Sequence, residues 1–187
     1  MKEKGVWTPP NMKPFYVRGN DSKASLDNVL NTPNKKIQIF SEEVVESGKT
    51  GVPVYVKHPQ PKDGEFRFVQ GKVAVHTNAG TANVPVLNEL MPTNTLWMNV
   101  QSGAKLGLKD GDDIIVSNGK YEHKGKIKLT EGIRPDTVFT YHGFGRVSPE
   151  LKRAYGKGIN DNKLIPNIIG EAGNAVTSMT FVTVKKA

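Results

Sequence analysis

Residues 95–119 read TLWMNVQSGAKLGLKDGDDIIVSNG, a stretch in which short apolar runs alternate with turn-forming residues. Residues 95–99 predict a short strand that ends in an asparagine. Residues 100–106 predict a short helix, and Gly107 is expected to end it in the left-handed conformation that glycine adopts most readily. A strand that passes directly into a short helix is therefore the first unit of the expected fold.

The same stretch continues into a predicted hairpin. Asp110-Gly111 favours a turn, and residues 112–117 predict a strand with an Ile-Ile-Val centre. Asn118-Gly119 is typical of a type I′ turn, which needs positive φ at both central residues. Residues 121–129 predict the returning strand, with Ile127 and Leu129 on one face.

Further short strands are expected on both sides of this unit. Apolar residues alternate with polar ones around Gly71, at Phe66, Phe68, Val73 and Val75. The remaining expected elements are strands at 137–142 and 178–184 and a short helix at 149–155. Many short strands separated by turns favour a mainly β fold, a small closed barrel with a few short helices.

The first 65 residues predict an irregular N-terminal arm. Seven prolines interrupt it, and proline both restricts φ and removes a hydrogen-bond donor: Pro9, Pro10, Pro14, Pro33, Pro53, Pro59 and Pro61. Within the arm we expect short strands at 36–40 and 52–56 and a helical turn at 41–46 that closes at Gly48. The expected domains are therefore the arm, 1–65, and the barrel, 66–187.

Composition narrows the function classes. The 187 residues contain no cysteine, which excludes a disulfide or a cysteine-ligated iron–sulfur cluster within this chain. The net charge of +8 is compatible with binding to nucleic acid, to a membrane surface or to an anionic ligand. It is equally compatible with a basic surface that only contacts solvent. The lysines are scattered without interleaved aromatics, so we expect no nucleic-acid partner. The chain shows no signal peptide and no apolar run of membrane-spanning length, so we expect no direct membrane insertion.

Two loops have residues suited to a ligand. Residues 75–83, VHTNAGTAN, follow a predicted strand and combine hydroxyl, amide and small residues that let a phosphate or a pterin approach the backbone. Residues 142–145, HGFG, place glycines around Phe144 and permit a tight bend. Gly48-Lys49-Thr50 lacks the earlier glycine of a phosphate-binding P-loop. No spacing of histidines predicts a metal site and no spacing predicts a nucleophile and base, so we expect no catalytic residue in the chain.

Taken in order, these segments resemble the C-terminal cofactor-binding domain of the molybdopterin-dinucleotide oxidoreductases, the dimethyl sulfoxide reductase family. The matching segments are 31–41, Gly71 to Thr81, Leu96–Asn99, 104–112, 131–135, 142–145 and 158–164. Within that family the chain is most similar to the catalytic subunits of thiosulfate and polysulfide reductases, with arsenate and tetrathionate reductases close behind. The resemblance implies a six-stranded double-psi β-barrel.

The resemblance also implies a cofactor, molybdopterin guanine dinucleotide in a molybdenum bis(guanylate) centre. It places His76, Thr77, Asn78 and Thr81 at the phosphates and the pterin, and Asn99 and Ser102 at the guanosine. It places His142, Gly143 and Asn162 at the pterin edge. Ser102 stands where the family has an aspartate that binds the guanine, so this chain lacks that charge.

The resemblance further implies that the chain is part of an enzyme and inactive alone, because the family's metal ligand and iron–sulfur cysteines lie upstream. The implied partners are the N-terminal domains of the parent catalytic subunit and an iron–sulfur electron-transfer subunit, with the full-length enzyme in the periplasm. Two alternatives remain open: a freestanding double-psi barrel that binds another protein, and a basic barrel that binds nucleic acid.

Overall fold

A computed structural model describes residues 32–34, 36–55, 57–167 and 180–187. The chain divides into two compact units, residues 1–56 and 57–187. The predicted boundary between arm and barrel, at residue 65, stays a prediction.

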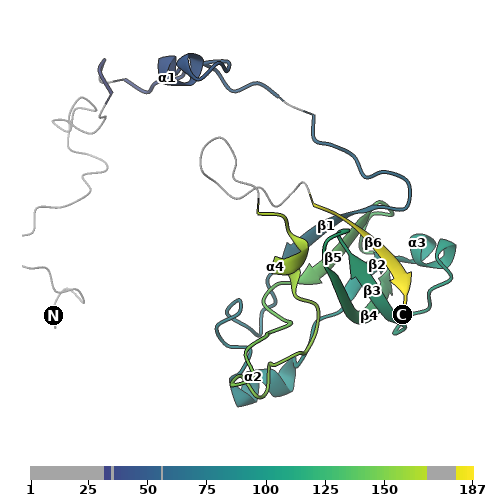
Figure 1. The fold of residues 1–187 in the computed structure, drawn as a ribbon. Helices are drawn as coiled ribbons and strands as arrows, with labels where there is room; N and C mark the ends of the chain where they lie inside the picture. Colours follow the sequence, from purple (N-terminus) through teal and green to yellow (C-terminus); the bar gives the residue numbers. More distant parts are fainter. Residues whose placement is uncertain (1–31, 35, 56, 168–179) are drawn as a thin grey trace, which may run out of the picture. The chain divides into compact units, whose positions relative to one another are not determined.

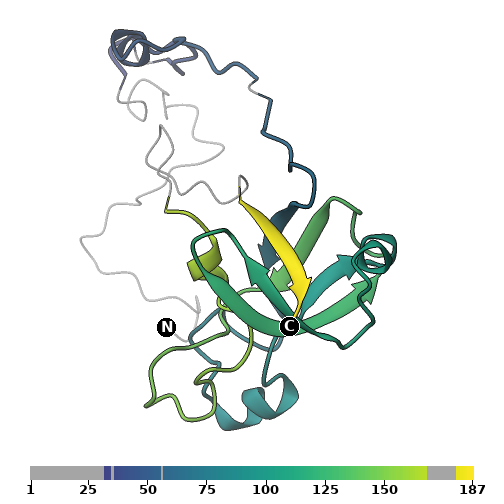
Figure 2. The same cartoon turned by 45° about the vertical axis from the view of Figure 1, so that its right-hand side comes forward.

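The second unit contains a closed barrel of six strands (Figures 1 and 2). The strands are β1 (Phe66–Gly71), β2 (Leu96–Asn99), β3 (Asp113–Ser117), β4 (Glu122–Thr130), β5 (Thr137–Tyr141) and β6 (Phe181–Lys186). Their order around the barrel is β1-β5-β2-β4-β3-β6, and β6 returns to β1. The expectation of a mainly β, six-stranded barrel is confirmed.

Two interleaved connections give the barrel its double-psi arrangement. Strands β1 and β2 lie on either side of β5, while β4 and β5 lie on either side of β2. The pairs β1/β5 and β2/β4 are parallel, with Arg67 opposite Thr137 and Leu96 opposite Ile127, and the other pairs are antiparallel. Each parallel pair therefore brings together strands that are distant in the sequence.

The barrel interior is filled by the alternate apolar residues of its strands. The apolar residues that are at most 1% exposed and come from these strands are Phe68, Leu96, Met98, Ile114, Val116, Ile127, Val138 and Val182. A strand directs successive side chains to opposite faces, so Trp97 and Phe139 lie on the outer wall, where their rings meet edge to face. Lys128 lies over the Trp97 ring, with its Nζ 4.4 Å from the ring centroid.

Three short helices accompany the barrel: α2 (Pro85–Leu90), α3 (Val100–Lys105) and α4 (Asp161–Leu164). Helix α3 follows β2 directly, as predicted, because the Asn99 side chain accepts a hydrogen bond from the Gln101 N–H and caps the first turn. Gly107 has φ +66°, which confirms its predicted left-handed conformation. These three are the helices of this unit within residues 57–167 and 180–187, and α2 and α4 were not predicted. Helix α1 (Glu42–Glu46), in the first unit, confirms the predicted turn before Gly48.

The hairpin between β3 and β4 exists, but its predicted turn type is wrong. Gly119 has positive φ and Asn118 does not. The Asn118 N–H donates to the Tyr121 carbonyl, so the pairing continues one residue further and the turn centres on Gly119 and Lys120. The Asn118 carboxamide oxygen accepts the Lys120 and Tyr121 N–H groups, which explains the shift.

Several predicted elements are absent from the described residues. Residues 36–40 and 52–55 form no strand, because the described residues there have no partner strand, and residue 56 lies outside the described part. Residues 73–75 turn away after β1 ends at Gly71. Residues 149–155 form turns instead of a helix, because the Arg153 and Ala154 N–H groups donate to the Asn83 side chain. The predicted strand at 178–184 begins at Phe181, and 178–179 lie outside the described residues.

Candidate functional site

The loop after β1 is held together by His76, which is buried at 5% exposure. Its Nε2 lies 2.9 Å from the Met91 carbonyl oxygen, and its Nδ1 lies 3.3 Å from the Thr81 hydroxyl. A carbonyl only accepts hydrogen bonds, so Nε2 carries a proton, and in the neutral ring Nδ1 accepts from the Thr81 hydroxyl. The Thr81 hydroxyl also accepts the Thr77 N–H at 2.9 Å. His76 and Thr81 thus shape the loop from within.

Several polar groups of this loop are exposed or lack a hydrogen-bond partner among the described residues. Thr77, Asn78 and Gly80 are exposed. Asn78 has φ +48°, the sole positive φ among the described residues other than glycine, and asparagine tolerates this conformation better than most residues. The N–H groups of Asn78 and Ala79 have no hydrogen-bond partner within the described residues. Successive N–H groups in such a turn form a concavity that suits an anion.

The loop after β5 packs directly against the first loop. Gly143 has φ +97°, and a β-carbon there would lie 2.8 Å from the Asn78 carbonyl carbon. The Phe144 ring meets the His76 ring edge to face, with centroids 5.5 Å apart. The structure therefore brings together His76, Thr77, Asn78 and Thr81 with His142 and Gly143, although more than sixty residues separate the loops.

Arg146 supplies a cation at this junction that the sequence analysis missed. Its Nη2 donates to the Ala79 carbonyl at 3.2 Å, while its Nε is buried with no hydrogen-bond partner in the described residues. No carboxylate forms an ion pair with Arg146 among those residues. Arg146 as a whole is only partly buried, so its guanidinium charge can attract the oxygen atoms of a phosphate-bearing ligand near the backbone N–H groups of Asn78 and Ala79.

His142 has a buried partner in Asp161, a second residue that the sequence analysis did not select. His142 Nδ1 lies 2.7 Å from Asp161 Oδ2, and the Gly143 N–H donates to Asp161 Oδ1 at 3.3 Å. The Asp161 side chain is 1% exposed and that of His142 is 28% exposed. Asp161 lies nineteen residues after His142 in an asparagine-flanked segment, and no spacing pattern links the two.

Asparagine side chains hold the loops in place. The Asn94 amide donates to the Tyr141 and Ile159 carbonyls and its oxygen accepts the Ile159 N–H. The Asn160 amide donates to the Gly145 carbonyl at 3.0 Å. Beyond the ends of the strands, these side chains bind backbone N–H and C=O groups that have no neighbouring strand to bind. Buried backbone groups need such hydrogen-bond partners.

Asn99 and Ser102 lie apart from these loops, at helix α3, which occupies a different side of the barrel from α2 in both views (Figures 1 and 2). The Asn99 amide donates to the Ile133 carbonyl at 2.8 Å, and the Ser102 hydroxyl donates to the Pro135 carbonyl at 2.7 Å. Both side chains thus fasten α3 to the loop before β5. Their contact with a guanosine stays a prediction.

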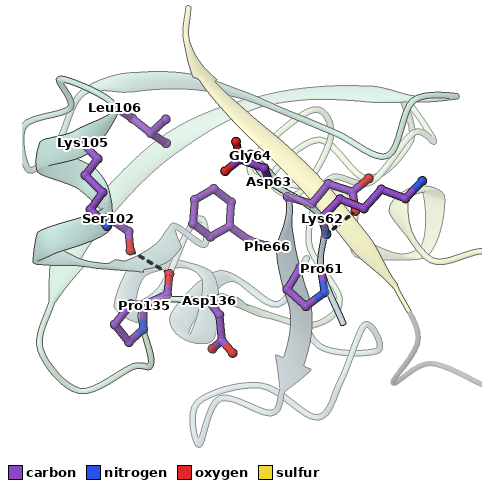
Figure 3. A pocket seen from close by; sticks show the side chains of 11 residues that line it. Pro61, Lys62, Asp63, Gly64, Phe66, Ser102, Lys105, Leu106, Pro135 and Asp136 are labelled. Atoms are coloured by element: carbon purple, nitrogen blue, oxygen red, sulfur yellow. Dashed lines mark hydrogen bonds between the residues drawn. The ribbon is translucent and has the colours of Figure 1, made fainter. Parts of the chain in front are cut away.

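A hollow of about 480 Å³ opens beside Ser102 (Figure 3). Its walls are the segment 61–65, the end of α3 at Lys105 and Leu106, and Pro135 with Asp136. Phe66 lies between these walls in Figure 3, so the hollow combines an aromatic surface with polar edges. Its size and chemistry suit a flat heterocycle.

Asn162 is the predicted site residue that the structure places elsewhere. It is exposed on α4 and lines a separate hollow of about 580 Å³ with the hairpin turn at Asn118–Tyr121. No described contact joins it to the loops at 76–81 and 142–146. Its contact with a pterin stays a prediction that this structure does not support.

The described residues provide neither a cluster of metal ligands nor a membrane-spanning helix. They contain no group of three or more histidine, aspartate or glutamate side chains placed to hold a metal ion. None of their helices has the length and apolar character needed to cross a membrane.

Residues 66–180 match the family model described as a molybdopterin dinucleotide binding domain. Over 159 residues the chain is 38% identical to the thiosulfate reductase molybdopterin-containing subunit PhsA of Salmonella typhimurium, covering 83% of this chain and 21% of the relative. It is 26% identical to the dimethyl sulfoxide reductase DmsA of Haemophilus influenzae, covering 76% of this chain and 20% of that protein. The chain thus spans about a fifth of the length of these relatives.

Among solved structures, acetylene hydratase from Pelobacter acetylenicus superimposes with a TM-score of 0.70 at 18% identity. The match covers 83% of this chain and 24% of that chain, and it supports the fold.

Proposed function

Since the chain belongs to the molybdopterin dinucleotide-binding domain family, we propose that its barrel binds the guanine dinucleotide part of a molybdenum bis(molybdopterin guanine dinucleotide) cofactor. The observation that carries this proposal is the junction of the loops at 76–81 and 142–146. There the Arg146 guanidinium, which has no carboxylate partner among the described residues, lies beside backbone N–H groups that also lack a partner among those residues.

The phosphates of the dinucleotide are assigned to the outer side of this junction. Arg146 supplies charge, the Asn78 and Ala79 N–H groups donate hydrogen bonds, and the exposed Thr77 hydroxyl and Asn78 amide add polar contacts. His76 and Thr81 act through the loop that they hold in shape, because their polar atoms already have protein partners. We propose this supporting role in place of the direct cofactor contact predicted for them.

The pterin edge is assigned to His142 and Gly143, and the guanosine to the α3 side of the barrel. His142 is partly exposed, and Gly143 permits close approach of the backbone. Asn99 and Ser102 keep α3 and the loop at 131–135 together beside the hollow next to Ser102. The resemblance implies an aspartate at the position of Ser102, so the guanine is expected to rely on backbone groups there.

The parent protein is proposed to be an oxidoreductase of the thiosulfate or polysulfide reductase type. The support is the 38% identity to a thiosulfate reductase subunit about five times as long as the matched region. When bound, the molybdenum centre supplies the redox chemistry, and this chain's residues bind and orient the cofactor. An irregular arm at 1–65, an iron–sulfur partner subunit and a periplasmic location belong to the same proposal.

Titration of the ¹⁵N-labelled 187-residue chain with GDP, followed by backbone amide shifts, tests the proposal. GDP represents the guanylate half of the cofactor, with ADP and a short DNA duplex as comparisons. We expect GDP-specific shifts at 76–81, 99–107 and 142–146. Arg146→Gln should weaken GDP binding about tenfold, because a charge-assisted hydrogen bond is lost.

The matched control is Lys124→Gln, which removes one positive charge from an exposed position on β4. It should leave the GDP affinity within about twofold. Equal responses to GDP and ADP, or equal losses in the two variants, would contradict the proposal. A response to DNA that disappears with added salt would instead favour the nucleic-acid alternative.

A further inference from the structure

The carboxylate of Asp161 is buried and makes two hydrogen bonds at the base of the loop after β5. Oδ2 accepts from His142 Nδ1 at 2.7 Å, and Oδ1 accepts the Gly143 N–H at 3.3 Å. A carboxylate that is 1% exposed is costly unless such donors surround it. The two oxygens therefore have distinct partners, which fixes the orientation of the carboxylate.

This arrangement determines which nitrogen of His142 carries the proton. An ionised carboxylate only accepts hydrogen bonds, so Nδ1 of His142 must donate. Nε2 has no hydrogen-bond partner among the described residues, and the side chain is 28% exposed. In the neutral imidazole Nε2 is then a free acceptor.

The backbone holds this histidine where the two loops meet. The His142 N–H donates to the Gly71 carbonyl at 2.9 Å, which extends the β1/β5 pairing by one residue. Directly after it, Gly143 packs against the Asn78–Ala79 backbone. His142 thus stands at the junction assigned above to the phosphate and pterin.

We propose that Asp161 is a positioning residue that keeps His142 in the Nδ1–H tautomer and so presents Nε2 as an acceptor to an N–H donor of the bound pterin. This inference rests on the proposed function. The inference also predicts a preference of the site among ring edges. Because Nε2 accepts a hydrogen bond, an edge with amine or amide N–H groups should bind better than an edge with carbonyl oxygens. Asp161 itself lies behind the histidine and touches no ligand.

The ¹⁵N shifts of the histidine rings test the tautomer without any ligand. Long-range ¹H–¹⁵N spectra of the full 187-residue chain at about pH 8.5, above the ordinary histidine pKa, distinguish Nδ1–H from Nε2–H. We expect Nδ1–H at His142. His76 provides a built-in comparison, because its bond to the Met91 carbonyl requires the opposite tautomer, Nε2–H.

Asp161→Asn should reverse the His142 tautomer. The amide oxygen can keep the Gly143 N–H, which leaves the amide nitrogen opposite Nδ1. An amide nitrogen only donates, so Nδ1 must accept and the proton must move to Nε2. His76 should not change, and the control Glu131→Gln, at an exposed carboxylate, should change neither histidine.

Binding of a soluble pterin, neopterin, measures the consequence. In the wild-type chain we expect the His142 Nε2 resonance to shift on addition of neopterin, and we expect Asp161→Asn to weaken binding about tenfold. The GDP affinity should change less than twofold in the same variant, because the phosphate contacts do not involve His142.

Three outcomes would overturn the inference: an Nε2–H or doubly protonated His142 in the wild-type chain, no Nε2 shift with neopterin, or equal neopterin binding by Asp161→Asn. The wild-type spectrum decides the tautomer even if the variant does not fold. GDP binding without a neopterin effect would refute the role of Asp161 and leave the nucleotide site standing. Failure of both ligands would refute the proposed function itself, and the pterin contact with it.

Discussion

At Gly143 the backbone leaves no room for a side chain. Its φ of +97° lies in the region that L-residues avoid, and a β-carbon would lie within 2.9 Å of three backbone atoms of Asn78 and Ala79. These are backbone atoms, so they cannot yield by rotating a side chain. The contact between the two loops thus depends on the absence of a single atom.

Gly143→Ala is expected to destabilise the chain by about 2–3 kcal/mol, from the strained φ together with the collision. Gly119→Ala is the matched control, because Gly119 has φ +83° and open space around it, so it should show the strain alone, about 1 kcal/mol. Urea unfolding gives both values, and amide shifts at 78 and 79 report the displaced loop. Equal losses in the two variants would show that the loops do not pack as described.

At the scale of the elements, side-chain hydrogen bonds connect the ends of the strands, in addition to the backbone hydrogen bonds between paired strands. Asn94 precedes β2, is 2% exposed, and connects the end of β5 at Tyr141 with Ile159 before α4. Gly158 makes room for it, because a β-carbon there would lie 2.4 Å from the Asn94 oxygen. One amide therefore joins three segments distant in the sequence.

Asn94→Ala should lower the free energy of unfolding by about 3 kcal/mol, because three buried backbone groups lose their partner at about 1 kcal/mol each. The exposed Asn162→Ala should change it by less than about 0.5 kcal/mol. Denaturant unfolding measures both. If Asn94→Ala lowers the free energy of unfolding no more than the control does, water must replace the Asn94 amide at the Tyr141 and Ile159 backbone groups.

At the scale of the whole molecule, ion pairs on the surface make the stability of the fold depend on pH. The Arg134 guanidinium holds the pKa of Asp136 below its usual range, and the Thr137 hydroxyl adds to this. A carboxylate with a lowered pKa in the folded state stabilises the fold above its unfolded pKa, and that contribution is lost as the pH falls through the folded pKa.

Asp136→Asn is expected to cost less than about 1 kcal/mol at pH 7, since the carboxylate is over one-third exposed. The difference from wild type should shrink below about pH 4 and vanish once Asp136 is protonated. Unfolding curves from pH 7 to pH 2 check this, with Glu131→Gln as the exposed control. A difference that persists in strong acid would assign the effect to packing instead of charge.

The sequence by itself determined the local elements of the barrel and the family. Strands β2 to β5 and helix α3 lie close to where alternation, the asparagine cap and Gly107 predicted them, because these signals act within a few residues. The predictions were wrong where an element depends on residues that are distant in the sequence. Residues 36–40 have a strand pattern but no partner strand in the part of the chain that the structure describes. Residues 149–155 include helix-forming residues, but the Arg153 and Ala154 N–H groups donate to the Asn83 side chain.

Only the tertiary structure decided which residues form the site. The loop at 75–83 could be proposed for ligand binding from the sequence, because a run of small polar residues after a strand is visible there. Contact of Thr77 and Asn78 with a ligand stays a prediction. Arg146 and Asp161 could not be proposed from the sequence, since an isolated charge gains its role from neighbours 67 and 19 residues away. The interleaved crossovers of the barrel create those neighbours by bringing the ends of β1 and β5 side by side, and this pairing depends on long-range packing that no local pattern encodes.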